Sequence, residues 1–208
     1  MTLPAAIGLA LLGLALGLGL GWLGARRRYR RRLDIESRAL ETALREARTD
    51  ALTGIANRKA FDEHLELLSA IARRYDSALA LALFDFDGLK QLNDRHGHAA
   101  GDAALVRFAT VLRHLSRESD FVARVGGDEF AVLMPQTGRE GAAALVRRIS
   151  QALAEGADPA PLRASAGIAE LAAGQPPAQL LEHADRALYA AKHATTAQLA
   201  ARGVSPTD

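Results

Sequence analysis

The sequence predicts an α/β (α+β) protein in which a central, mostly antiparallel sheet is flanked by helices. Residues 77–86 form a nearly continuous apolar run, which is typical of a strand buried on both faces. Two short apolar runs on either side of Gly126-Gly127 indicate a β-hairpin. The segments between these strands carry apolar residues at helical spacing. Residues 50–193 therefore read as helix, strand, helices, hairpin, helix, strand and helix.

The N-terminal run predicts a single transmembrane helix within residues 1–25. Residues 4–24 contain no charge, and as a helix they would span about 30 Å, the thickness of a bilayer core. Trp22 stands at the end of the run, and arginines follow it rather than precede it, unlike in a cleavable signal peptide. This charge pattern favours the inner membrane, with the rest of the chain in the cytoplasm. The alternative is a buried helix of a soluble protein.

The distribution of charge argues against a nucleic-acid partner. Residues 1–32 hold six arginines and no acid, whereas the whole chain of 208 residues carries a net charge of only +2. The remaining residues are therefore acidic overall, which is unsuited to a phosphate backbone. The chain has no cysteine, so neither a disulfide framework nor thiol chemistry is available.

Residues 26–49 read as a basic flank followed by a helical linker. Apolar residues in this linker and just after it approximate the spacing of a coiled coil, at Leu33, Leu40, Leu44, Ala47 and Ala51. Glycines at every fourth position of the apolar run would let two helices approach closely, at Gly13, Gly17 and Gly21. Both patterns favour a homodimer. The alternative for the linker is a solvated single helix. The alternative for the glycines is that their spacing only reflects a run rich in Gly, Ala and Leu.

The elements of the folded part follow from caps and periodicity. Asn57 can cap a helix over Arg58 to about Tyr75, with apolar residues at Phe61, Leu65, Leu68 and Ile71. After the strand at 77–86, we expect a short helix over 88–94 and an amphipathic helix over 102–116. The hairpin comes next, followed by a helix over 138–154, a strand over 162–171 and a helix over 177–193. Residues 196–208 are expected to be a loose tail.

Acidic residues gather where predicted strands end. Asp85 and Asp87 close the apolar run, and Asp128 and Glu129 follow the glycine pair directly. A charge at the end of a buried strand is costly unless a partner neutralises it. Mg²⁺ is commonly held by one or two carboxylates together with substrate phosphates. The pattern indicates a metal beside a phosphate; the alternative is a set of solvated acids at strand ends and turns.

Two further groups of polar residues have the chemistry of nucleotide contacts. Lys90 follows the first acid pair and could meet a phosphate, and Asn93 and Asp102 could read a guanine edge together. Arg117 and Asp120 lie shortly before the hairpin. An arginine can clamp a phosphate or a guanine edge, and an aspartate can accept from guanine.

Several of these segments resemble the motifs of the GGDEF family, the diguanylate cyclases, in family order. They are the opening segment Asp50 to Arg58, the stretch from Asp85 to Asp102, the signature from Gly126 to Phe130 and the helix segment Ala184 to Lys192. The resemblance covers nearly all of the predicted cytoplasmic part and places a catalytic domain at residues 50–195. It implies a palm-like fold and the condensation of two GTP into cyclic di-GMP, with release of pyrophosphate, between two facing domains.

The resemblance also implies roles for individual residues. Asp128 and Glu129 would be catalytic and, with Asp85 and the carbonyl of Phe86, would bind two Mg²⁺ or Mn²⁺ ions per active site. Asn93 and Asp102 would hold guanine, and Lys90, Leu89 and Lys192 would complete the substrate site. Arg117 and Asp120 would form an inhibitory site for the product. These assignments come from the family pattern and not from spacing.

The chain departs from the family pattern at a few positions. Leu89 replaces the usual Phe, Ile55 replaces Leu, and Thr196 stands where a phosphate-binding Arg is expected. The final strand of the family is also missing from the expected elements. These departures keep a second hypothesis open, a catalytically weak module that binds cyclic di-GMP as an effector. A membrane-anchored structural coiled coil is a third hypothesis, but it explains only residues 1–49.

Overall fold

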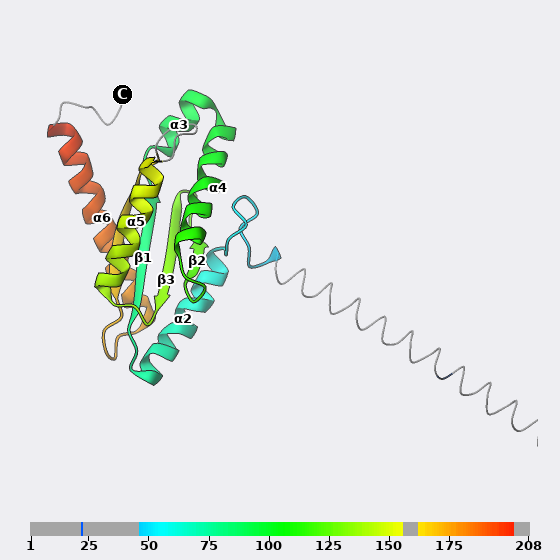
Figure 1. Cartoon of the computed structure of the whole chain (residues 1–208), viewed down its shortest axis with the longest axis vertical. Helices are drawn as coiled ribbons and strands as arrows, with labels where there is room; N and C mark the ends of the chain where they lie inside the picture. The colour runs from blue at the N-terminus through cyan, green and yellow to red at the C-terminus, as the bar shows by residue number, and fades with distance from the viewer. Residues whose placement is uncertain (1–21, 23–45, 156–161, 202–208) are drawn as a thin grey trace, which may run out of the picture. The chain divides into compact units, whose positions relative to one another are not determined.

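A four-stranded sheet organises the part of the chain that the computed structural model describes, namely Trp22 and residues 46–155 and 162–201, with side chains as far as Ala194. The strand order is β2-β3-β1-β4, and each neighbouring pair is antiparallel. The strands are β1 (Leu79–Phe86), β2 (Phe121–Arg124), β3 (Glu129–Pro135) and β4 (Ala164–Glu170). The expected antiparallel α/β architecture is thus confirmed (Figure 1).

Helices cover both faces of this sheet. The helices α2 (Arg58–Tyr75) and α6 (Pro177–Ala201) pack on one face, and α4 (His98–Leu115) and α5 (Arg139–Glu155) on the other. The short helix α3 (Leu89–His96) leads from β1 into α4. Every residue of β1 is buried, as predicted for a strand between two layers.

The alternation of side chains along the strands divides the core in two. Leu79, Leu81 and Leu83 of β1 face the α2 and α6 side. Phe84 faces the other side, where its ring meets Phe108 of α4 at 5.9 Å between centroids. Because the same alternation continues to the end of the strand, Asp85 falls on the α2 and α6 side.

The predicted helix after Asn57 is confirmed at both ends. The Asn57 side-chain oxygen accepts a hydrogen bond from the Ala60 N–H at 3.1 Å, and α2 ends at Tyr75. The periodicity was wrong at one position, because Ile71 is 41% exposed.

Several expected boundaries are wrong. The linker helix was expected to reach 49, but the helix ends at Glu46, and Thr49 forms a bridge with Ala56 instead. Helix α4 begins at His98 rather than at 102, because Gly97 separates it from α3. Helix α6 continues to Ala201, so residues 196–201 of the expected tail are helical.

The transmembrane prediction falls on residues 1–25, which, apart from Trp22, lie outside the described residues, as does the linker up to residue 45. Among the helices that the structure does describe, none is both long enough and apolar enough to cross a bilayer.

Candidate active site

The predicted metal ligand Asp85 is buried near the end of β1, where it pairs with a lysine from α6. The Lys192 ammonium nitrogen lies 2.6 Å from an Asp85 carboxylate oxygen. Burial raises the pKa of Asp85, Asp128 nearby adds to this effect, and Lys192 opposes it. Burial alone would lower the pKa of Lys192, but the carboxylate of Asp85 and the charges of Asp128 and Glu129 raise it. Lys192 is therefore a protonated counter-ion for this acidic cluster.

The signature hairpin brings two more acids to the same end of the sheet. Glu129 is the first residue of β3 and pairs directly across from Asp85 on β1. The Asp128 carbonyl accepts a hydrogen bond from the Phe86 N–H at 2.9 Å, which ties the turn to the end of β1. The structure thus brings together the four residues predicted as metal ligands.

The first glycine of the signature is required by the position of Glu129. A Cβ on Gly126 would lie 2.5 Å from a Glu129 carboxylate oxygen, so the glutamate folds over this residue. A Cβ on Gly127 would meet nothing within 4 Å, which leaves that backbone open to a ligand. Neither glycine is among those with positive φ, so left-handed backbone is not the reason for the pair.

The donor set fits a divalent cation that a substrate helps to hold. The carboxylates of Asp85, Asp128 and Glu129 are oxygen donors of the kind that Mg²⁺ prefers. However, no group of three or more acids or histidines within the described ranges is arranged as a ready metal site. The geometry is compatible with an Mg²⁺ ion that is bound by two of these carboxylates and by phosphate oxygens of a substrate, because Mg²⁺ is often bound in that way.

Asp87 lies beside this cluster but is bound to another strand. Its carboxylate accepts a hydrogen bond from the Ser165 hydroxyl of β4 at 2.9 Å. Burial raises the pKa of Asp87, and the charge of Asp85 adds to the effect, whereas Ser165 and Lys192 oppose it. The strand ends at Phe86, so Asp87 lies in the turn that follows it and not on the strand that carries Asp85.

The predicted guanine-binding pair lies at the contact between α3 and α4. The Asn93 side-chain oxygen packs so closely on Gly101 that a Cβ there would overlap it. This oxygen is buried and has no hydrogen-bond partner in the described structure. Asp102, next to Gly101, is exposed. The two predicted residues therefore lie on adjoining helices, and Asn93 contacts the residue directly before Asp102.

Of the other predicted substrate residues, Lys90 and Leu89 lie on α3, and Lys192, the partner of Asp85, lies on α6. Lys90 is exposed, whereas Leu89 is half-buried and packs against the core on the α4 and α5 side. Thr196, the departure from the family pattern, lies on the extension of α6 beyond Lys192.

Arg117 and Asp120 border a pocket of about 330 Å³. They form a tight turn in which the Arg117 N–H donates to the Asp120 carboxylate at 2.8 Å and the Asp120 N–H donates back to the Arg117 carbonyl. The other Asp120 carboxylate oxygen and the Ser116 hydroxyl are buried without a hydrogen-bond partner among the described residues. Arg113 also lines the pocket. A polar ligand could therefore use the two arginines that line the pocket, whereas the two unsatisfied oxygen atoms are covered by the protein itself.

Sequence reasoning missed the contacts of Arg124, just before the glycine pair. Its guanidinium joins Asp50, 74 residues earlier in the chain, to the carbonyl of Gly127. The motif that contains Asp50 was found from its resemblance to the family pattern, without any indication of this contact. Proximity across such a separation follows from tertiary structure and leaves no periodic signal in the sequence.

Comparison with known proteins defines the class. The family model for the diguanylate cyclase GGDEF domain matches residues 47–198. The chain is 41% identical over 160 residues to the diguanylate cyclase DgcP of Pseudomonas aeruginosa, covering 74% of this chain and 24% of that protein. It is 37% identical over 149 residues to the diguanylate cyclase DgcS of Shewanella oneidensis, covering 71% of this chain and 50% of that one.

A solved structure is similar over most of the chain. The coiled coil and GGDEF domain of DgcB from Caulobacter crescentus, in complex with c-di-GMP, align with a TM-score of 0.77 and 31% identity. The alignment covers 83% of this chain and 95% of that one. This chain belongs to the GGDEF diguanylate cyclase family. It spans half or less of the length of the curated relatives described above.

Proposed function

We propose that this protein is a diguanylate cyclase, which condenses two GTP molecules into cyclic di-GMP and releases pyrophosphate. The observation that supports the proposal is the acidic cluster formed by residues at the end of β1 and in the signature hairpin. Asp85 and Glu129 face each other across the sheet, and a cation from α6 already neutralises Asp85. Such a cluster can hold divalent cations against a triphosphate.

The protein side chains have separate tasks in this scheme. Asn93 and Asp102 bind the guanine edge, since a carboxylate accepts the hydrogens that guanine presents and adenine lacks. Lys90 contacts the triphosphate, and Leu89 lines the substrate site next to it. Asp85, Asp128, Glu129 and the Phe86 carbonyl hold two Mg²⁺ or Mn²⁺ ions. When bound, these ions lower the pKa of the ribose 3′-hydroxyl and neutralise the leaving pyrophosphate.

Lys192 has two partners in this proposal. In the structure its ammonium group pairs with Asp85. When cations occupy the acidic cluster, the same group is free to turn towards the triphosphate, because like charges repel. The lysine thus keeps the acids close together before the substrate arrives.

One domain offers one GTP site, so the reaction requires two domains that face each other. The a/d spacing of the linker and the glycines of the apolar run support a homodimer. The uncharged run at residues 4–24, with its arginine flank, supports a single-pass anchor in the inner membrane with the catalytic domain in the cytoplasm.

The pocket beside Arg117 and Asp120 supports a product site that acts as a feedback inhibitor site. Cyclic di-GMP offers phosphates and guanine edges to the arginines that line this pocket. The complex of DgcB with c-di-GMP shows that a structural relative binds this molecule.

The direct test uses the full-length protein in detergent, given GTP and Mg²⁺, with products identified by mass spectrometry. We expect cyclic di-GMP from the native protein and none from Glu129→Ala. Glu66→Ala is a matched control, because Glu66 is an exposed residue of α2. Absence of product, with tight binding of cyclic di-GMP that Arg117→Ala abolishes, would instead identify an effector module.

A further inference from the structure

The segment that enters the catalytic domain is attached to the sheet through the backbone of Ala56. Thr49 forms an antiparallel bridge with Ala56, and Ala56 forms a parallel bridge with Ala123 of β2. The Arg124 N–H donates to the Ala56 carbonyl at 2.8 Å. Residues 49–57 therefore form a loop, the entry loop, that lies against the edge strand leading into the signature hairpin.

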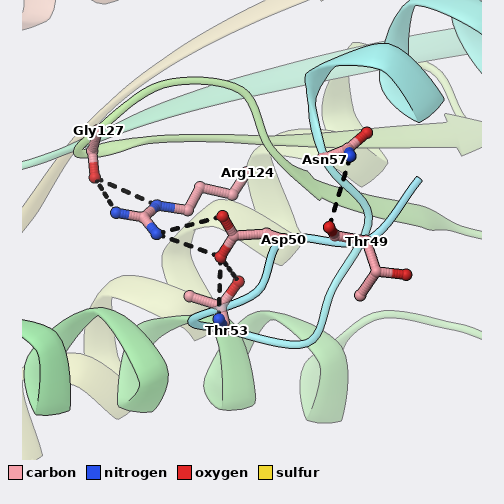
Figure 2. Close-up of polar contacts among 6 residues, drawn as sticks. All are labelled: Thr49, Asp50, Thr53, Asn57, Arg124 and Gly127. Carbon is pink, nitrogen blue, oxygen red and sulfur yellow. Dashed lines mark hydrogen bonds and ion pairs between the residues drawn. The ribbon is translucent and has the colours of Figure 1, made fainter. Parts of the chain in front are cut away.

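One side chain of the entry loop reaches the hairpin directly (Figure 2). The Asp50 carboxylate accepts hydrogen bonds from the Thr53 N–H at 2.9 Å and the Thr53 hydroxyl at 2.6 Å. It also accepts two hydrogen bonds from one Arg124 nitrogen, at 3.1 and 3.3 Å. Burial would raise the pKa of Asp50, but the hydrogen bonds from Thr53 and Arg124 hold it below its usual value.

The other side of the Arg124 guanidinium holds the signature turn. Its two remaining nitrogens donate to the Gly127 carbonyl at 3.2 and 2.6 Å. The side chains of Arg124 and Asp50 are only 13% and 23% exposed. Bidentate contacts of a planar guanidinium fix direction as well as distance, which a lysine ammonium group does not.

The neighbouring backbone of the turn is attached elsewhere. The Val125 and Gly126 N–H groups both donate to the Glu129 carbonyl, and the Asp128 carbonyl is bound by the Phe86 N–H. Gly127 lies between these two attachments, and glycine has the largest conformational freedom of any residue. The Arg124 contact therefore adds an attachment at Gly127, the residue directly before Asp128 and Glu129.

We propose that Arg124 is a positioning residue for Asp128 and Glu129, and that Asp50 holds Arg124 in the required orientation. The entry loop would then set the geometry of the acidic cluster, so a displacement of the chain where it enters the domain changes the rate of the reaction. This inference rests on the proposed cyclase activity for its kinetic consequences, but not for its structural ones.

The test compares Arg124→Lys and Asp50→Asn in the full-length protein. Lysine keeps the charge but cannot bind Asp50 and Gly127 together, and asparagine keeps the shape of Asp50 but not its charge. We expect kcat to fall about 10- to 100-fold, the loss typical of small misplacements, while KM for GTP stays within about threefold. Arg48→Ala is the control, because Arg48 lies in the same segment and its exposed ion pair goes to Glu63, away from the hairpin.

A second measurement separates positioning from the activity itself. Hydrogen exchange of peptides covering residues 121–130 should rise in both variants and stay unchanged in Arg48→Ala. A non-additive loss of kcat in the double variant would support a shared function of the pair. Native kcat in Arg124→Lys together with unchanged exchange would overturn the proposal. If the native protein makes no cyclic di-GMP, the proposed function fails, while the exchange experiment still tests the attachment of the turn.

Discussion

At the scale of single residues, the two glycines of the signature have different functions. Gly126 makes room for the Glu129 carboxylate, whereas the space beside Gly127 is open. A side chain at either position does not enter the hydrophobic core. Variants at the two glycines therefore test the geometry of the proposed active site with little effect on folding. The sequence alone does not distinguish them, because both are identical letters in one motif.

The pair gives a sharp comparison between two variants. Gly126→Ala should displace the Glu129 carboxylate and lower kcat about 100-fold, because a shift of about 1 Å in a catalytic group has this effect. The free energy of unfolding should fall by about 1 kcal/mol, since the Glu129 carboxylate must move away and the Glu129 Cβ would lie at a tight 3.1 Å. Steady-state kinetics and urea unfolding measure the two quantities.

Gly127→Ala is the matched variant. It should leave the unfolding free energy within about 1 kcal/mol of the native value, and any loss of activity should appear in KM for GTP, as expected if a ligand approaches this backbone. Equal kcat in the native protein and Gly126→Ala would show that the position of Glu129 over Gly126 has no catalytic importance.

At the scale of elements, the contact between α6 and β4 places Lys192. Gly167 of β4 lies so close to α6 that a Cβ would overlap the Ala184 carbonyl and the Leu188 N–H. The backbone of a helix cannot shift locally to make room for a Cβ, whereas a flexible side chain can. The glycine in this strand therefore sets how near the helix lies, and with it how far Lys192 reaches towards Asp85.

Gly167→Ala should consequently destabilise the protein and weaken the site together. We expect a loss of about 1–3 kcal/mol in the free energy of unfolding, the usual effect of overpacking, measured by urea unfolding with Gly127→Ala as the control. A stability equal to that of the native protein would show that α6 can move away from the sheet without cost.

At the scale of the whole molecule, activity should depend on the meeting of two chains. Leu40→Glu places a charge at an a/d-type position of the predicted linker and should lower turnover per chain about tenfold at low protein concentration. Raising the concentration should restore part of the loss, because association follows mass action. Glu41→Ala is the control, and turnover of Leu40→Glu equal to the native value would contradict linker-mediated dimerisation.

Most of the fold could be predicted from the sequence because its strands and helices have strong local signals. The apolar run of β1, the hairpin around the glycine pair and the Asn57 cap all lie where the pattern indicated. Helix ends were less predictable. Ala-rich residues such as those after Lys192 favour continuation of a helix, and no glycine or proline stops α6 before Ala201.

The candidate site was predictable in its residue types but not in its contacts. Asp85, Asp128 and Glu129 were found from their positions at strand ends. The pairing of Asp85 with Lys192 and that of Asp50 with Arg124 join residues far apart in the sequence. Such pairs depend on how the helices and the entry loop pack on the sheet, which periodicity does not encode.

The outer edge of β4 has a consequence for behaviour at high concentration. Within the described residues, β4 is an end strand of the sheet, and unpaired edges invite pairing between molecules. Arg139 covers part of this edge: its guanidinium donates to the Ile168 carbonyl at 3.2 Å, and its N–H donates to the Glu170 carboxylate at 2.7 Å. Charged side chains at a sheet edge oppose pairing with another sheet, so replacing Arg139 and Glu170 with apolar residues is expected to promote association through β4.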